Sequence, residues 1–207
     1  MKVILVNGSP HQNGCTNRAL QEIQQQLTKN GVDSEIFWIG TKVQGCIGCY
    51  SCVEKGKCVF DDIVGEFLEK AKDADGFIFG SPVYYGSCTG TIKCFMDRAF
   101  FSGGQYLSYK PGACVVSCRR GGATEAFAQL NMYLTISSMP VISSQYWNQV
   151  HGRRNPQEVE QDLEGLQTMR TLADNMAWTL KCIENGKQNG IGKPEPEPII
   201  RTNFVRE

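Results

Sequence analysis

The sequence lacks any long hydrophobic run and any excess of charge of one sign. Nowhere do about 18 consecutive apolar residues occur, the length that a membrane-spanning helix needs. Lys plus Arg number 21 and Asp plus Glu also number 21, so no overall field favours nucleic acid or an anionic membrane. We therefore expect neither of them as a partner.

The first residues also lack the pattern of a secretory signal peptide. The apolar run at 3–6 is short, and Asn-Gly-Ser-Pro follows it at once. This predicts a cytoplasmic location, where thiols stay reduced. Ten cysteines in such a chain favour metal or redox chemistry over a disulfide scaffold.

What is present is a chain of 207 residues in which short apolar runs alternate with helical periods. With 41% apolar and 20% charged residues, it has the composition of an ordinary globular domain. The helical periods begin near 17, 61, 89, 121 and 159, and the last runs as one long amphipathic helix to about 180. The runs typical of strands are 2–6, 34–39, 76–81, 113–118 and 141–147.

Five strands alternating with five helices predict an α/β fold with a parallel sheet covered on both faces. Right-handed crossovers favour a flavodoxin-like three-layer sandwich, with a five-stranded parallel sheet of order 2-1-3-4-5. We expect one domain over 1–185 with a cysteine-rich insertion at 45–60. Residues 186–207, which contain KPEPEP, are expected to form an extended C-terminal tail.

The loop after the first strand, GSPHQNGCTN at 8–17, is rich in hydroxyls, amides and glycine and opens a helix. Free N–H groups at a helix N-terminus together with Ser and Thr donors favour a phosphate site. The loop has no Gly-Lys before its Thr and is not GxGxxG, so it is neither a Walker loop nor a classical dinucleotide site. The alternative is a polar loop that only caps the helix.

The loop after the third strand, SPVYYGSCTGT at 81–91, offers aromatic rings. Pro82 stiffens the backbone, Tyr84 and Tyr85 can pack on a flat ring, and Gly86 allows close approach. The alternative is a turn with two core tyrosines.

The loop after the fourth strand, SCRRGGAT at 117–124, offers hydrogen-bond donors. Gly121 and Gly122 can present backbone N–H groups to a carbonyl-rich ring edge, and Arg119 or Arg120 can stabilise an anionic reduced ring. The arginines are otherwise a solvated surface pair. A phosphate cradle, an aromatic platform and a donor-rich edge together match FMN.

The segment GCIGCYSCVEKGKC at 45–58 holds four cysteines, Cys46, Cys49, Cys52 and Cys58. Thiolates so closely spaced can wrap an iron–sulfur cluster, and ferredoxins use the same two-residue gaps. The final gap is longer than in the ferredoxin run. The alternatives are four reduced thiols that pack as small hydrophobes, or zinc, which usually takes its ligands from two separated knuckles.

GSPHQNGCTN, SPVYYGSCTGTIKCFMDR and the Gly pair after the fourth strand resemble the flavodoxin-like NADPH-dependent FMN reductases. CIGCYSCVEKGKC resembles the compact cysteine motif of the iron–sulfur flavoproteins in that superfamily. The resemblance covers about residues 1–185. It implies FMN held by the three loops, a [4Fe–4S] cluster on the four cysteines, and a homodimer or homotetramer.

Carried over to this chain, the resemblance assigns three groups of FMN-binding residues. The residues assigned to the phosphate are Ser9, His11, Asn13, Thr16 and Asn17. The group that lines the isoalloxazine is Pro82, Val83, Tyr84, Tyr85 and Gly86. The group that meets the pyrimidine side is Ser117, Arg120, Gly121 and Gly122.

These features predict an FMN-dependent oxidoreductase that takes electrons from NAD(P)H or a protein donor and passes them to a quinone, a flavin or another small acceptor. We expect no catalytic side chain, because the redox chemistry belongs to FMN. The alternatives are a non-enzymatic electron carrier or redox sensor, and a zinc-stapled binding module. Trp147 and His151 are either packing residues or part of a substrate pocket.

Overall fold

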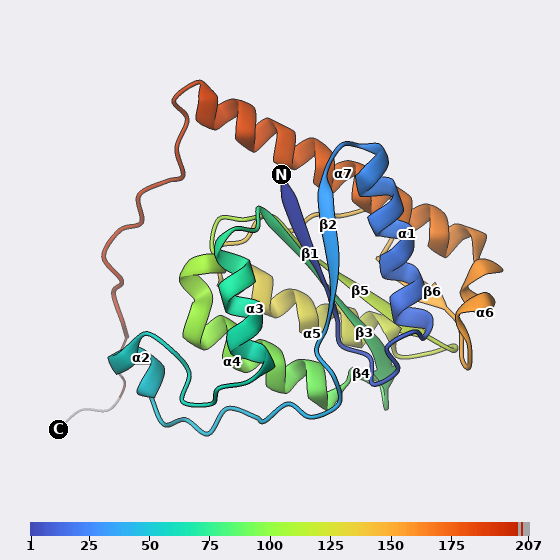
Figure 1. The fold of residues 1–207 in the computed structure, drawn as a ribbon, viewed down its shortest axis with the longest axis horizontal. Helices are drawn as coiled ribbons and strands as arrows, with labels where there is room; N and C mark the ends of the chain where they lie inside the picture. The colour runs from blue at the N-terminus through green and yellow to red at the C-terminus, as the bar shows by residue number, and fades with distance from the viewer. Residues whose placement is uncertain (203, 205–207) are drawn as a thin grey trace.

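The computed structural model describes residues 1–202 and 204, and within them a parallel sheet lies between two layers of helices (Figure 1). Within these residues the parallel strands run in the order β2-β1-β3-β5-β6, and a short β4 pairs antiparallel with β3. When only the parallel strands are numbered, this is the predicted order 2-1-3-4-5. The strands are β1 Lys2–Asn7, β2 Asp33–Trp38, β3 Gly76–Tyr84, β4 Ser87–Cys88, β5 Gly112–Cys118 and β6 Gln149–His151.

The helices divide between the two faces of the sheet, and this confirms the three-layer sandwich. On one face lie α1 Cys15–Lys29, α6 Pro156–Glu160 and α7 Leu163–Gln188. On the other lie α3 Ile63–Lys72, α4 Gly90–Leu107 and α5 Ala123–Ile136. The cysteine-rich segment contains one further short helix, α2 Ser51–Lys55.

The first strand shows why a continuous apolar run was needed. Its side chains alternate between faces, so Val3 and Leu5 pack in the core under α1 and α7, while Ile4 and Val6 pack in the core under α3, α4 and α5. All four are fully buried. The strand is therefore buried on both faces, as its sequence predicts.

Side-chain and glycine caps fix the ends of the helices. Asn30 ends α1, and Gly31 follows in the left-handed region with φ 72°, a common way for a helix to end. Thr89 caps α4 by accepting a hydrogen bond from the Ile92 amide at 3.2 Å. Its Oγ1 also donates to the Gly8 carbonyl at 3.0 Å, which ties the start of α4 to the loop after β1.

The predicted fifth strand at 141–147 is wrong in its position. Only Val141 forms a bridge there, to Gly112, and the parallel strand is β6 at Gln149–His151. The chain leaves the sheet because its polar residues pair with α7: the Ser144 hydroxyl donates to the Thr168 carbonyl, and the Ser143 carbonyl accepts from Asn175.

The long final helix predicted from 159 to 180 is two helices. Val159 lies in α6, and a new helix begins after Asp162, whose carboxylate accepts from the Gly165 amide at 2.9 Å. An Asp that caps a new N-terminus competes with continuing the preceding helix. α7 then reaches Gln188, and residues 191–202 and 204 lie outside helix and strand. The tail assignment for 186–207 stays a prediction, and residues 203 and 205–207 lie outside the described residues.

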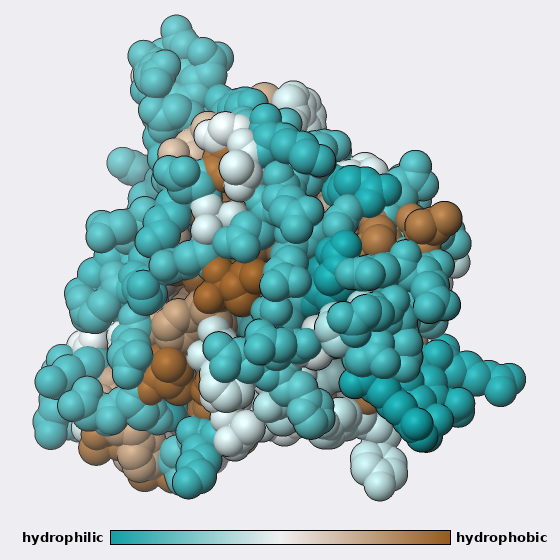
Figure 2. Space-filling model, turned by 45° about the vertical axis from the view of Figure 1, so that its right-hand side comes forward, coloured by the Kyte–Doolittle hydropathy of each residue, from teal (hydrophilic) through white to brown (hydrophobic). Residues whose placement is uncertain are grey.

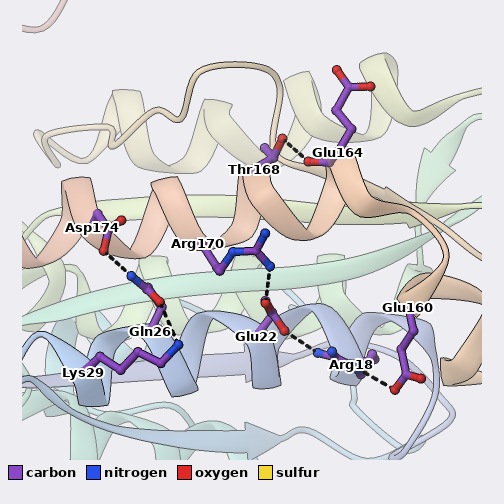
Figure 3. Close-up of polar contacts among 9 residues, drawn as sticks. All are labelled: Arg18, Glu22, Gln26, Lys29, Glu160, Glu164, Thr168, Arg170 and Asp174. Carbon is purple, nitrogen blue, oxygen red and sulfur yellow. Dashed lines mark hydrogen bonds and ion pairs between the residues drawn. The ribbon is translucent and has the colours of Figure 1, made fainter.

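A buried carboxylate joins α1 to α7 (Figure 3). Glu22 is 8% exposed and accepts from Arg18, at 2.9 Å within α1, and from Arg170 on α7. Burial alone would raise the pKa of Glu22, but the hydrogen bonds from Arg170 and Arg18 outweigh it and hold this pKa below the ordinary 4.5. A carboxyl with a lowered folded-state pKa stabilises the protein above its unfolded pKa, and this contribution is lost as the pH falls through the folded one.

Replacing Glu22 with Gln should lower the free energy of unfolding at pH 7 by about 1–2 kcal/mol, because two arginines lose a charged partner. The variant should also lose less stability than the wild type when the pH falls below about 4.5. Urea unfolding at pH 7 and pH 3.5 measures both effects. Glu160→Gln is the control, because this half-exposed carboxylate also pairs with Arg18, at 3.3 Å. Equal losses in the two variants would contradict the role of burial.

The surface in the view of Figure 2 is mostly hydrophilic and is interrupted by small hydrophobic patches. Among the residues that the structure describes, no helix combines the length and the apolar character needed to cross a membrane.

Candidate functional site

The carboxyl ends of β1, β3, β5 and β6 surround a cavity of about 270 Å³. Parallel sheets bind ligands at this edge, where the strand order reverses. The cavity is lined by Ser9, His11, Gly14, Cys15, Thr16, Pro82, Val83, Tyr84, Ser117, Cys118, Arg119, Gly152, Arg153 and Arg154.

The loop after β1 is held in shape by its own polar groups. The Asn7 side chain accepts from the Ser9 amide at 3.0 Å and donates to the Gln12 carbonyl at 3.0 Å. The Ser9 hydroxyl accepts from the His11 amide at 3.1 Å. The loop therefore turns back on itself before α1 begins at Cys15.

The N-terminus of α1 is suited to an anion. Its N-cap Gly14 has no side chain to bind the first amides, and the first turn contains no acidic residue. The leading N–H groups of a helix have no intrahelical acceptor, and the helix dipole adds positive potential there. Cys15 and Thr16, in this first turn, line the cavity.

Two of the predicted loops are joined directly by their side chains. The Thr16 and Ser117 hydroxyls lie 2.9 Å apart, and these residues are 1% and 3% exposed. Buried hydroxyls that bond each other still have free lone pairs or a proton for a ligand. This hydroxyl pair therefore connects the residues predicted to bind the phosphate with those predicted to meet the pyrimidine side of the ring.

The loop after β3 is a tight hairpin that contacts the loop after β5. Tyr85 and Gly86 both have positive φ, at 51° and 76°, as the two central residues of a type I′ turn require. Gly122 has φ 88°, and a Cβ there would lie 2.8 Å from the Gly86 Cα and 2.9 Å from a Val83 methyl. Only glycine lets the two loops approach this closely.

Seven of the fourteen predicted FMN-binding residues line the cavity. These are Ser9, His11, Thr16, Pro82, Val83, Tyr84 and Ser117. The other seven do not line it, and their assignment stays a prediction. Of these, Tyr85 is fully exposed, Asn17 is buried beside Asn7, and the others are Asn13, Gly86, Arg120, Gly121 and Gly122.

Sequence reasoning missed Arg153 and Arg154 because it ended the last strand too early. Their backbone amides donate to the Glu158 carboxylate, at 3.2 Å for Arg154, and this fixes the loop after β6. Cys15 also bonds this loop, through the Asn155 carbonyl at 3.3 Å. The signal that was available is the Gly-Arg-Arg that follows the true strand end.

The two thiols in the cavity are not activated. Burial, together with the nearby Glu158, raises the pKa of Cys15, and burial together with Asp162 raises the pKa of Cys118. A raised pKa keeps a thiol protonated near neutral pH, so neither residue is a nucleophilic thiolate.

Trp147 and His151 line a separate depression of about 220 Å³, together with residues at the start of α7. The His151 Nδ1 lies 3.0 Å from an Asp162 oxygen, and the rings of Tyr146 and Trp147 lie 5.4 Å apart. The structure therefore does not place this pair in the main cavity.

The four cysteines of the insertion line one small cavity of about 20 Å³, together with apolar side chains and Arg98. All ten cysteines of the chain are free thiols. Among residues 1–202 and 204, no three His, Cys, Asp or Glu side chains are close enough to hold a metal ion. Gly48 and Gly56 have φ 64° and 70°, and Tyr50 has φ 55°, so three residues of the segment adopt the left-handed backbone conformation.

Comparison with solved structures shows the class first: the fold is that of the flavodoxin-like proteins. A flavodoxin from the domain Archaea matches with a TM-score of 0.60 and 18% identity, over 87% of this chain and 99% of that chain. The flavoenzyme NAD(P)H:(acceptor) oxidoreductase of Paracoccus denitrificans matches with a TM-score of 0.62 and 17% identity, over 84% of this chain and 96% of that chain.

The sequence comparisons then give the family. The chain belongs to the NADPH-dependent FMN reductase family, whose model matches residues 1–153, and is a relative of the iron–sulfur flavoproteins. An iron–sulfur flavoprotein of Methanocaldococcus jannaschii is 34% identical over 192 residues, which are 89% of this chain and 100% of that protein. An iron–sulfur flavoprotein of Methanosarcina thermophila is 26% identical over 192 residues, which are 90% of this chain and 99% of that protein. The family expected from the sequence is confirmed.

Proposed function

We propose that this protein is an FMN-dependent oxidoreductase. The observation that carries the proposal is the cavity at the carboxyl ends of the parallel strands, where the loops after β1, β3 and β5 meet. It offers hydroxyls and a helix N-terminus for a phosphate, Tyr84 for a flat ring, and arginines for negative charge. Bound FMN would supply the electron or hydride transfer.

The roles of the protein's own residues are binding and electrostatics. Ser9, Thr16 and the start of α1 bind the phosphate, and Arg153 and Arg154 add positive charge beside it. Pro82, Val83 and Tyr84 form an apolar wall for the ring. Arg119, which lines the same cavity, favours a negatively charged reduced ring.

The proposed reaction takes electrons from NAD(P)H or a reduced protein and delivers them to a quinone, a flavin or another small acceptor. Steady-state turnover with NADPH or NADH and a soluble quinone tests it. Reduction of the bound flavin without turnover would favour the carrier or sensor instead. We also propose that the protein works as a homodimer or homotetramer, as the family resemblance implies.

We further propose that Cys46, Cys49, Cys52 and Cys58 bind a [4Fe–4S] cluster. The donor set fits, because four free thiols of one segment face one cavity. A cluster binds each thiolate at a different iron, so its ligands stand further apart than those of a single zinc ion. The present cavity has room for about one water, so the segment must widen around the cluster.

Replacing both Ser9 and Thr16 with Ala should raise the Kd for FMN at least about tenfold. Each hydrogen bond to a charged group is worth about 1.5–3 kcal/mol, and the double variant removes two hydroxyl donors. Fluorescence titration of flavin-free protein measures the Kd. Thr28→Ala is the control, because this exposed hydroxyl lies at the other end of α1. Wild-type affinity in the double variant would show that the phosphate lies elsewhere.

A further inference from the structure

Arg98 on α4 is the most deeply buried charged side chain beside the cysteines, with 1% of its surface exposed. Its Nε lies 3.3 Å from the Cys58 sulfur, and its Nη1 lies 3.2 Å from the Gln44 carbonyl oxygen. Gln44 precedes the first of the four cysteines, and Cys58 is the last. One guanidinium therefore joins the two ends of the segment that carries the proposed ligands.

The same guanidinium is anchored by its remaining contacts. Nη1 and Nη2 form a two-pronged pair with the Asp62 carboxylate, at 2.7 and 2.8 Å, and the Phe60 ring lies 4.9 Å from the guanidinium carbon. Arg98 thus bonds to three positions on a stretch that contains α2 and the N-cap of α3. Its planar fork of donors allows this, whereas a lysine ammonium is a single point charge.

A purely structural ion pair between α3 and α4 would need only the Asp62 contact. Asp62 has 27% of its side chain exposed, and it keeps its own role as N-cap of α3 through the Val64 amide at 3.1 Å. The bonds to Cys58 and Gln44 go beyond that need. Both are made to the cysteine segment, which otherwise contains few regular hydrogen bonds: the Val53 amide donates to Tyr50, and the Gly56 amide to Cys52.

We propose that Arg98 is the positioning residue of the cysteine segment: it closes the segment at Gln44 and presents the sulfur of Cys58 as a cluster ligand. This rests on the proposed cluster function of the four cysteines. In the proposed bound form, the Arg98 Nε–H, which already lies 3.3 Å from the Cys58 sulfur, would donate to the Cys58 thiolate. Hydrogen bonds to ligand sulfurs and nearby charge are among the factors that set a cluster's reduction potential.

The test compares the wild type with Arg98→Met and Arg98→Lys, all produced and purified without oxygen. Iron, acid-labile sulfide and FMN are measured per chain, and the reduction potential is measured by a titration followed by electron paramagnetic resonance. FMN content is the internal control, because the main cavity shares no lining residue with the cysteine cavity. Methionine preserves the unbranched stem, and lysine also preserves the charge that faces Asp62.

The wild type should contain about four irons and four sulfides per chain, and Arg98→Met fewer than about one of each, with wild-type FMN content. In Arg98→Lys, the clusters that form should have a more negative potential, because the bond to the Cys58 sulfur is lost. Wild-type iron content and potential in both variants would overturn the proposal. If Arg98→Met fails to fold, which its FMN content reveals, Arg98→Lys decides by the same measurements.

A wild type that contains FMN but no iron would refute the proposal that the cysteines bind a cluster. It would not refute the proposal that Arg98 holds the segment closed. Hydrogen exchange of iron-free protein then decides about Arg98. Peptides from 45–60 should exchange about tenfold faster in Arg98→Met than in the wild type, with peptides from β1 and α1 unchanged. Equal exchange in the two proteins would overturn the role of Arg98 independently of the cluster.

Discussion

Replacing Phe67 with Ala is expected to lower the free energy of unfolding by about 3–5 kcal/mol, the largest stability loss that we predict. Phe67 on α3 is fully buried, and its ring centroid lies within 6.3 Å of four others. The closest, Phe95 on α4, is an edge-to-face contact at 5.1 Å. The other rings are Phe37 on β2 and Phe77 and Phe79 on β3, so the substitution removes the side chain at which these two strands meet α3 and α4.

Urea unfolding of flavin-free protein measures this loss, and Phe101→Ala is the matched control. Phe101 lies on α4 but has 53% of its surface exposed, so its removal leaves no closed cavity and should cost under about 1 kcal/mol. A loss for Phe67→Ala no greater than that of the control would mean that the aromatic cluster repacks to fill the space.

Replacing Gly122 with Ala should raise the Kd for FMN by about tenfold to a hundredfold while leaving most of the fold intact. The residue must keep φ 88°, which costs a non-glycine residue about 1–2 kcal/mol. The new methyl group would also lie 2.8 Å from the Gly86 backbone, which is too close, so the loops after β3 and β5 must separate. These are two of the loops that we propose to hold the ring.

Flavin titration measures this effect, and Gly90→Ala is the control. Gly90 begins α4 directly after the same hairpin, and a Cβ there meets nothing within 4 Å. Unchanged FMN affinity in Gly122→Ala would show that the contact between the two glycines is not needed for the flavin site.

The sequence predicts the sheet well because buried parallel strands leave a strong local signal. The run at 3–6 must be apolar at every position to fill two cores, and the structure confirms it. Gly31 likewise marks the end of α1, since its backbone conformation favours glycine. Such features depend on neighbours in the chain, so one sequence is enough to find them.

Features that depend on distant partners could not be predicted in this way. Ser143 and Ser144 leave the sheet because α7 lies beside them, and that placement misled the assignment of the last strand. The mistaken strand end concealed Arg153 and Arg154 in turn. The role of Arg98 depends on partners 36 to 54 residues away, and no local pattern reveals such a contact.

Helix α4 gives the molecule a rigid spacer between its two candidate redox sites. Thr89, at its first turn, is bonded to the loop beside the flavin cavity, and Arg98 is bonded to the cysteine segment. Nine residues of α-helix span about 13 Å. Because Thr89 and Arg98 are both bonded, this part of α4 fixes the separation of the two bonded loops, and any electron exchange within one chain takes place across a distance that these nine residues help to set.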